Sequence, residues 1–223
     1  MNNENNTSRP AWTLAGLFLA LFGLIIITTA YRMALGPVQS ASESVLRELL
    51  LFLALALLLF IVKRGEGLSF ASLGWRTDHV GRSLLWGLIG ALLCAVGLAA
   101  SLGLIMLFKL HFGGDGKPQF QAPVWAVAIT VFRAGIIEEV FYRGYAIDRL
   151  KRLTGSTPVA IVVPLLVFAA AHYRQGLGGV LIALVMGGIL TAVFLKRRDL
   201  LTVITAHTLV DFVPNVVLPL ISG

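Results

Sequence analysis

The sequence has few charged residues and a single cysteine. Only 13% of its 223 residues are charged, whereas soluble domains contain about a quarter. Hydrophobic residues make up 57% of the chain, and the mean hydropathy is +0.87. This composition excludes an ordinary soluble domain and indicates an integral, multi-pass membrane protein. Cys94 lies in an apolar run and, as the only cysteine, cannot form an intrachain disulfide.

The chain also lacks a polar segment long enough to fold as a soluble domain, and it contains no internal repeat. Its two longest loops, 63–82 and 109–123, are each shorter than a domain. The first apolar run, 12–31, is too long for the hydrophobic region of a typical signal peptide and lacks a clear basic region before it and a small-residue cleavage site, so we interpret it as a retained span. The polar tail 1–11 is expected to be disordered and cytoplasmic.

Seven apolar runs are candidates to cross the hydrocarbon core, which takes about 20 helical residues. They are 12–31, 45–62, 83–108, 123–147, 157–173, 177–195 and 200–221. A split at Pro214 would add an eighth short helix. We therefore predict an all-α, polytopic transmembrane helical bundle that forms one membrane domain. Within it, residues 12–122 form the N-terminal helices and residues 123–223 form the core that carries the motifs discussed below.

The net charge of +7 lies mainly in short loops between apolar runs, which is typical of topology control and not of nucleic-acid binding. With seven spans, eleven of the 18 Lys and Arg residues fall on the side of the N-terminus and five on the other side. The positive-inside rule then predicts a cytoplasmic N-terminus and an extracytoplasmic C-terminus. We expect a bacterial-type plasma membrane, with the lipid bilayer as a partner and no nucleic acid.

Ionisable residues within the spans are informative, because each costs about 2.5–3.5 kcal/mol on insertion. At about 1.5 Å per helical residue, Glu138 and His172 lie about 19 and 21 Å from the predicted cytoplasmic ends of their spans. His207 and Asp211 lie about 12 and 18 Å along theirs. Three spans thus bring polar groups to a similar depth, which predicts one buried cluster.

The spacing of these residues suggests how they pair. Glu138 and Glu139 are adjacent, so their side chains point about 100° apart on a helix. Glu139 and Arg143 are four residues apart in the favourable order, which predicts an ion pair. That pair leaves Glu138 free to face the histidines. His207 and Asp211 are also four residues apart and share a helix face.

Each residue alone also has a simpler explanation. A histidine such as His172 is more often an interhelical hydrogen-bonding residue than a catalyst, and Asp211 could serve helix packing. Arg133 is expected to snorkel or to pair with a glutamate. His79 and His111 lie in predicted loops and are expected to be solvated. Only the shared depth of the cluster favours a functional interpretation.

A carboxylate beside a histidine can hold and deprotonate water, and a second histidine can donate to a developing oxyanion. Such a set is sufficient to hydrolyse an acyl bond without a covalent intermediate. Two histidines and a glutamate could instead bind zinc, although the usual HExxH pattern is absent. A proton relay in a transporter is a third option, although no inverted repeat is found. The sequence indicates no cofactor and no metal.

Three motifs resemble those of a known family. "EEVFYRG" (138–144) resembles EExxxR, "FAAAH" (168–172) resembles FxxxH, and "HTLVD" (207–211) resembles HxxxN/D. These are motifs of the CPBP family, the CAAX prenyl protease and bacteriocin-processing (Abi) membrane proteins, which are intramembrane glutamic endopeptidases. "FASLGW" (70–75) also resembles a loop often found before the core of that family.

The resemblance implies a helical bundle with a site open to the cytoplasm and an endopeptidase acting on a membrane protein or peptide. It implies that Glu138 and His172 activate water and that His207 and the residue at position 211 stabilise the oxyanion. It assigns supporting roles to Glu139, Arg143 and Phe168. A non-proteolytic scaffold or immunity protein on the same fold remains the alternative.

Asp211 departs from the family pattern, because members with established CAAX proteolysis carry Asn there. An amide donates to an oxyanion, whereas an ionised Asp cannot. We therefore expect Asp211 to orient His207 by accepting its N–H, with His207 as the donor. The departure weakens the expectation of a prenylated substrate. Separately, Gly179, Ala183 and Gly187 form a small-residue face that is expected to pack within the bundle.

Overall fold

The computed structural model describes residues 10–113 and 121–222, and every regular element in these ranges is a helix. The predicted all-α fold is thereby confirmed. The α-helices are α1 (Pro10–Leu35), α2 (Ala41–Phe60), α3 (Val80–Phe108), α4 (Val124–Glu138), α5 (Ile147–Thr154), α6 (Thr157–Ala171), α7 (Gly176–Arg197), α8 (Leu200–Phe212) and α9 (Leu218–Ser222). The π-helical segments are Ile61–Gly65, Glu139–Ala146 and Val213–Val217, and the 3₁₀ segments are Phe70–Leu73 and Tyr173–Gln175.

Each of the seven predicted apolar runs is helical. Five helical stretches are long and apolar enough to cross a membrane: Pro10–Leu35, Ala41–Gly65, Val80–Phe108, Tyr173–Arg197 and Leu200–Ile221. Helix α6 is apolar but shorter, and the stretch from α4 onward carries Arg133 and two glutamates. The chain is thus a multi-pass membrane protein, and the number of seven spans stays a prediction.

The two ends of the chain refine the predicted boundaries. Of the tail 1–11 that is expected to be disordered, residues 1–9 lie outside the described residues. Helix α1 already begins at Pro10. Near the C-terminus, Pro214 lies in a π-helical segment that joins α8 to α9. Because proline lacks an N–H donor, a local change in hydrogen bonding is expected there. The last segment is therefore divided by a π turn and not by a loop.

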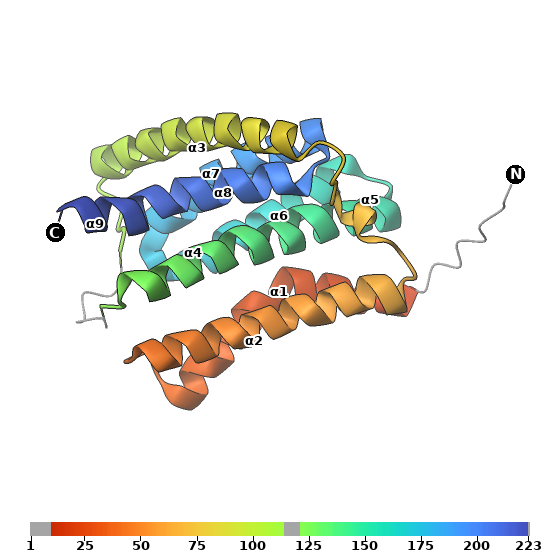
Figure 1. Ribbon diagram of the computed structural model, residues 1–223, viewed down its shortest axis with the longest axis horizontal. Helices are drawn as coiled ribbons and strands as arrows, with labels where there is room; N and C mark the ends of the chain where they lie inside the picture. Colours follow the sequence, from red (N-terminus) through yellow and green to blue (C-terminus); the bar gives the residue numbers. More distant parts are fainter. Residues whose placement is uncertain (1–9, 114–120, 223) are drawn as a thin grey trace, which may run out of the picture.

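Successive long helices run in alternate directions along the bundle (Figure 1). As a result, the loops after α2, α5 and α7 gather at the end where α1 begins. These loops contain most of the basic residues that the positive-inside rule placed on one side. We refer to this end, defined by residues 61–82, 149–157 and 196–200, as the basic end.

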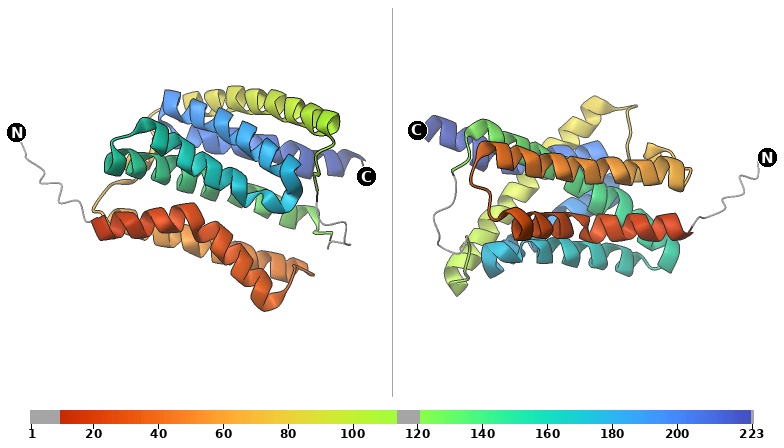
Figure 2. Two further views of the ribbon diagram at one scale, coloured as in Figure 1. Left: turned by 180° about the vertical axis from the view of Figure 1, so that it is seen from behind. Right: turned by 90° about the horizontal axis from the view of Figure 1, so that it is seen from below.

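The helices form a layered bundle in which α4 lies between two groups (Figures 1 and 2). Helices α1 and α2 form a pair along one side, and α3 packs against α8 and α7 on the other. Glycine allows the α3–α8 contact to be close, because a Cβ on Gly87 would lie 2.6 Å from the Cβ of Thr205. Seen from below, α3 crosses the direction of α2 obliquely, in line with the tilt expected of a long helix.

The segment that follows α4 occupies the centre of the bundle. The π-helical residues Glu139–Ala146 are all buried, and they contact α1, α6 and α8. Two of the eight are charged, so a protein interior that excludes water must satisfy them with partners from other helices. The motif "EEVFYRG" is therefore placed where its polar side chains meet several helices at once.

Candidate active site

The two adjacent glutamates lie at a change in helix type. Glu138 is the last residue of α4, and Glu139 begins the π-helical segment. Such π turns inside α-helices are frequent at functional sites. The side chain of Glu138 is 14% exposed and that of Glu139 is 0% exposed. Neighbours in the sequence are thus placed in different environments.

Glu139 is held by a cation and a histidine. Its Oε1 atom accepts a hydrogen bond from Arg143 Nη1 at 2.8 Å and lies 2.7 Å from His207 Nδ1. The predicted Glu139–Arg143 ion pair is therefore confirmed. The expectation that the pair would leave the histidines to Glu138 is wrong for His207, which binds Glu139 instead. Among the described residues, Glu139 Oε2 is buried and has no hydrogen-bond partner.

Arg143 links this carboxylate to α7. Its Nη2 atom donates to the carbonyl oxygen of Gly187 at 3.1 Å, and its Nε atom lies 3.5 Å from Thr191 Oγ1. The guanidinium also lies over the Phe168 ring, 4.6 Å from the centroid. Gly187 belongs to the small-residue face, which packs within the bundle as expected. Arg143 is thereby fixed in place by three elements.

His207 lies between two carboxylates. Its Nδ1 atom faces Glu139, and its Nε2 atom lies 3.4 Å from Asp211 Oδ2. Ionised carboxylates only accept hydrogen bonds, so both ring nitrogens can donate only when the ring carries two protons. Asp211 is the more exposed neighbour, with 38% of its side chain accessible. The Nε2 atom is therefore the side of the ring that a substrate could share.

His172 follows α6 as its C-terminal capping residue and is half-buried. Its Nδ1 atom lies 2.9 Å from the carbonyl oxygen of Phe168. A carbonyl oxygen is an acceptor, so the proton belongs on Nδ1. In the neutral ring Nε2 then holds the lone pair, which can accept a hydrogen bond from water.

Phe168 brings the three motif segments together. Its ring centroid lies 4.9 Å from that of His172, 5.2 Å from that of Tyr142 and 6.4 Å from that of His207. These contacts join α6, the π-helical segment and α8 at one buried ring. Of the four residues expected to cluster, His172 and His207 contact this ring and Asp211 lies beside His207, whereas Glu138 takes part in a separate network.

Glu138 takes part in a separate network. Its Oε1 atom accepts a hydrogen bond from Arg133 Nη1 at 3.2 Å, and among the described residues it bonds to neither histidine. Arg133 also donates from Nε to Glu48 Oε2 at 2.6 Å. The expectation that Arg133 pairs with a glutamate is confirmed, with two glutamates instead of one.

Sequence reasoning missed Glu48 and Thr191. Glu48 lies inside the predicted span 45–62, and its side chain is only 3% exposed. A carboxylate within an apolar run was the signal used for Glu138, and it could have found Glu48 as well. Thr191 could not have been found, because a threonine in an apolar helix carries no such signal.

A second buried ion network lies at the basic end. Arg149 Nη2 donates to Glu66 Oε2 at 2.7 Å, and Tyr145 donates to Glu66 Oε1 at 2.9 Å. Burial opposes the charge on Arg149, but its hydrogen bonds to Glu66 raise the pKa of Arg149 above its usual value. Glu66 also accepts from Thr13 on α1. This network ties α1 and the loop after α2 to the core, away from the three motifs.

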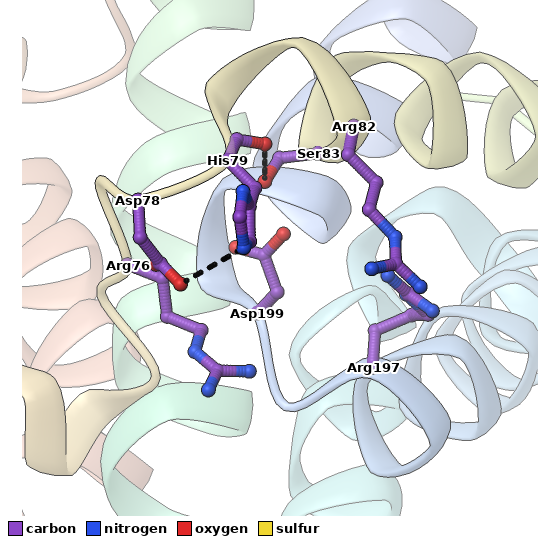
Figure 3. A pocket seen from close by; sticks show the side chains of 7 residues that line it. All are labelled: Arg76, Asp78, His79, Arg82, Ser83, Arg197 and Asp199. Atoms are coloured by element: carbon purple, nitrogen blue, oxygen red, sulfur yellow. Dashed lines mark hydrogen bonds and ion pairs between the residues drawn. The ribbon is translucent and has the colours of Figure 1, made fainter.

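A small hollow of about 60 Å³ also opens at the basic end (Figure 3). His79 lies there beside Asp78, with its Nε2 atom 3.5 Å from Asp78 Oδ2, and is well exposed. Both His79 and His111 lie outside the helices and are exposed, in line with their predicted loop positions. No predicted catalytic residue lines the hollow, so it is separate from the cluster around Phe168. Its lining residues are Arg76, Asp78, His79, Arg82, Ser83, Arg197 and Asp199.

The fold and the site together define a class of protein: a polytopic membrane protein with buried carboxylates and histidines supplied by three helices. Within residues 10–113 and 121–222, no three His, Cys, Asp or Glu side chains gather as a metal-binding group would.

Comparison of the sequence with known protein families is more specific. Residues 120–213 match the family model described as "Type II CAAX prenyl endopeptidase Rce1-like", which confirms the family resemblance for this part of the chain. The match contains all three motifs, whereas helices α1, α2 and α3 lie outside it. No curated protein and no solved structure matches the chain.

Proposed function

We propose that this protein is an intramembrane endopeptidase that hydrolyses a peptide bond of a membrane-associated or lipidated substrate, with Glu138 as general base. The observation that carries the proposal is the meeting of the three motif segments at Phe168. The family match over residues 120–213 supports a CAAX-type endopeptidase in general. The role of Glu138 as the base comes from the motif resemblance, and its partly exposed carboxylate supports it.

In the proposed reaction, one water molecule is held between Glu138 and Nε2 of His172. The carboxylate takes the proton as the water oxygen attacks the scissile carbonyl carbon, a role in which a general base contributes about 10²–10⁴-fold. The Nε2–H group of His207 donates to the resulting oxyanion. When the C–N bond breaks, the proton held by Glu138 passes to the leaving amine. Glu139 and Arg143 hold His207 and α7 in place.

The basic loops support an orientation with the basic end in the cytoplasm. A site reached from that side would meet the C-terminal segment of a cytoplasmic substrate. Because Asp211 stands where an amide is usual, we leave open whether the substrate is prenylated. Comparative membrane proteomics of cells expressing wild-type or Glu138→Ala protein would identify the substrate as an uncut protein that accumulates with the variant.

The mechanism is tested with purified protein and two fluorogenic peptides, one farnesylated at a C-terminal CAAX sequence and one unmodified. We expect Glu138→Gln and His172→Ala each to lower kcat by about 10²–10⁴-fold with unchanged folding. Glu138→Gln should fold because Arg133 keeps Glu48 as a counter-charge. Cleavage by Glu138→Gln with the kcat of the wild-type protein would contradict the proposal.

A non-proteolytic scaffold or immunity protein is the second candidate. It is favoured by one observation, that both ring nitrogens of His207 already face carboxylates. On this alternative the buried network stabilises the bundle and no water is activated. Full complementation of a null mutant by Glu138→Ala would favour it over the endopeptidase.

A further inference from the structure

Glu48 is a buried carboxylate in a helix that lies outside the family match. It belongs to α2, and its side chain is 3% exposed. A lone carboxylate at this depth is costly, so its partners decide whether it can remain ionised. The family match begins at residue 120 and therefore assigns no role to Glu48.

The partners of Glu48 come from two helices. Its Oε1 atom accepts from Arg47 Nη2 at 2.7 Å and from Thr130 Oγ1 at 3.0 Å. Its Oε2 atom accepts from Arg133 Nε at 2.6 Å. Arg47 lies on α2, whereas Thr130 and Arg133 lie on α4, so Glu48 is a fixed anchor between the two helices. Charge-assisted bonds of this length are among the stronger hydrogen bonds in proteins.

Arg133 is shared between two carboxylates. The 2.6 Å bond to Glu48 is shorter than the 3.2 Å bond to Glu138. The planar guanidinium has a rigid fork of donors, so a bond at Nε fixes the direction of Nη1. Glu48 therefore fixes where Arg133 can meet Glu138. Only Oε1 of Glu138 takes part in that contact, which leaves Oε2 to face a water molecule.

We propose that Glu48 is a positioning residue for the reaction, and that it acts through Arg133 to hold the Glu138 carboxylate in its working orientation. The proposal rests on the proposed function of Glu138. It gives the N-terminal helix pair a part in the site. A misplacement of about 1 Å in a catalytic group can lower the rate about 100-fold, so such an anchor has a measurable effect.

The test compares Glu48→Gln with a matched variant, Glu66→Gln. Glu66 is also a buried carboxylate bound by an arginine, but it lies at the basic end. With the farnesylated CAAX peptide and its unmodified counterpart, we expect Glu48→Gln to lower kcat about tenfold or more, with KM changed less than about twofold. Glu48→Asp, which keeps the charge, should retain most of the wild-type kcat. Glu66→Gln should lower the melting temperature and leave kcat near that of the wild type.

Wild-type kcat in Glu48→Gln would overturn the proposal, and so would an equal loss in Glu66→Gln, because that loss would report general destabilisation. If Glu138→Gln is inactive while Glu48→Gln is fully active, the positioning role fails and the proposed function stands. If Glu138→Gln cleaves normally, the proposed function itself fails. The network is also tested without substrate. Melting-temperature losses of Glu48→Gln and Arg133→Gln should be non-additive in the double variant, because the two side chains form one ion pair, and additive losses would contradict the coupling.

Discussion

The environments of Glu138 and Glu139 differ more than their adjacency suggests. Glu139 is fully buried on the side of α7 and α8, where Arg143 and His207 bind it. Glu138 faces the side of α2, where it makes one hydrogen bond to Arg133 and stays partly exposed. Glu139 belongs to a network that holds helices together. Glu138 has one oxygen without a hydrogen-bond partner among the described residues, which leaves it available for water.

Buried charge thus serves two purposes within one motif. The Glu139 carboxylate binds Arg143 and His207 through Oε1 and is fully buried, Oε2 included, so it is shielded from a water molecule that it could deprotonate. A carboxylate with one fixed oxygen and one accessible oxygen is oriented but still available as a base. We therefore expect substitutions of Glu139 and its partners to lower stability first, and substitutions of Glu138 to lower cleavage first.

The largest expected change in stability is at Arg143. Arg143→Gln leaves Glu139 buried without its cation, and breaking a buried ion pair on one side costs about 3–5 kcal/mol. We expect a clear loss of melting temperature in detergent. Arg152→Gln is the control, because Arg152 forms an exposed pair with Asp148 that contributes at most about 1 kcal/mol. If Arg143→Gln and Arg152→Gln lowered the melting temperature equally, the buried Glu139–Arg143 pair would stabilise the protein no more than an exposed pair does. The stabilising role given to Glu139 would then be wrong.

A smaller loss is expected at Gly187, which accommodates Arg143 and Phe168. A Cβ there would lie 2.9 Å from Leu165 Cδ1 and 3.0 Å from Phe168 Cδ1. Gly187→Ala should therefore destabilise by about 1–3 kcal/mol through overpacking. At the neighbouring Gly188 a Cβ would have no contact within 4 Å, so Gly188→Ala should be neutral or slightly stabilising. A neutral Gly187→Ala variant would show that the site around Arg143 is less tightly packed than described.

The smallest expected effect is at Asp211. Asp211→Asn replaces the acceptor near His207 Nε2 with an amide that can donate to an oxyanion. We expect cleavage of the farnesylated peptide to persist and to rise by up to about tenfold. Asp211→Ala, which supplies neither group, should lower it. Loss of cleavage in Asp211→Asn would mean that the carboxylate itself is needed, and that His207 is not the main donor.

Local features of the site could be predicted from the sequence. The helices over the predicted apolar runs follow from hydropathy, because a membrane helix satisfies its own backbone hydrogen bonds. The Glu139–Arg143 pair follows from a spacing of four residues. The angle between adjacent side chains correctly separated the two glutamates, but it could not show which of them faces His207.

The rest depends on how helices pack. The contact between Arg133 and Glu48 needs α2 beside α4, which no local pattern encodes. The π-helical segment at Glu139–Ala146 changes which residues face α8, and the sequence carries no clear signal for it. The tautomer of His172 depends on a carbonyl within its own helix, which became evident only with the structure.

The most direct test of the account measures cleavage and unfolding side by side for Glu138→Gln and Glu139→Gln. The account predicts that Glu138→Gln melts near the wild type but cleaves at least about 100-fold more slowly, whereas Glu139→Gln loses stability. The opposite pattern, with a stable and inactive Glu139→Gln and a fully active Glu138→Gln, would contradict the central claim that Glu138 is the base.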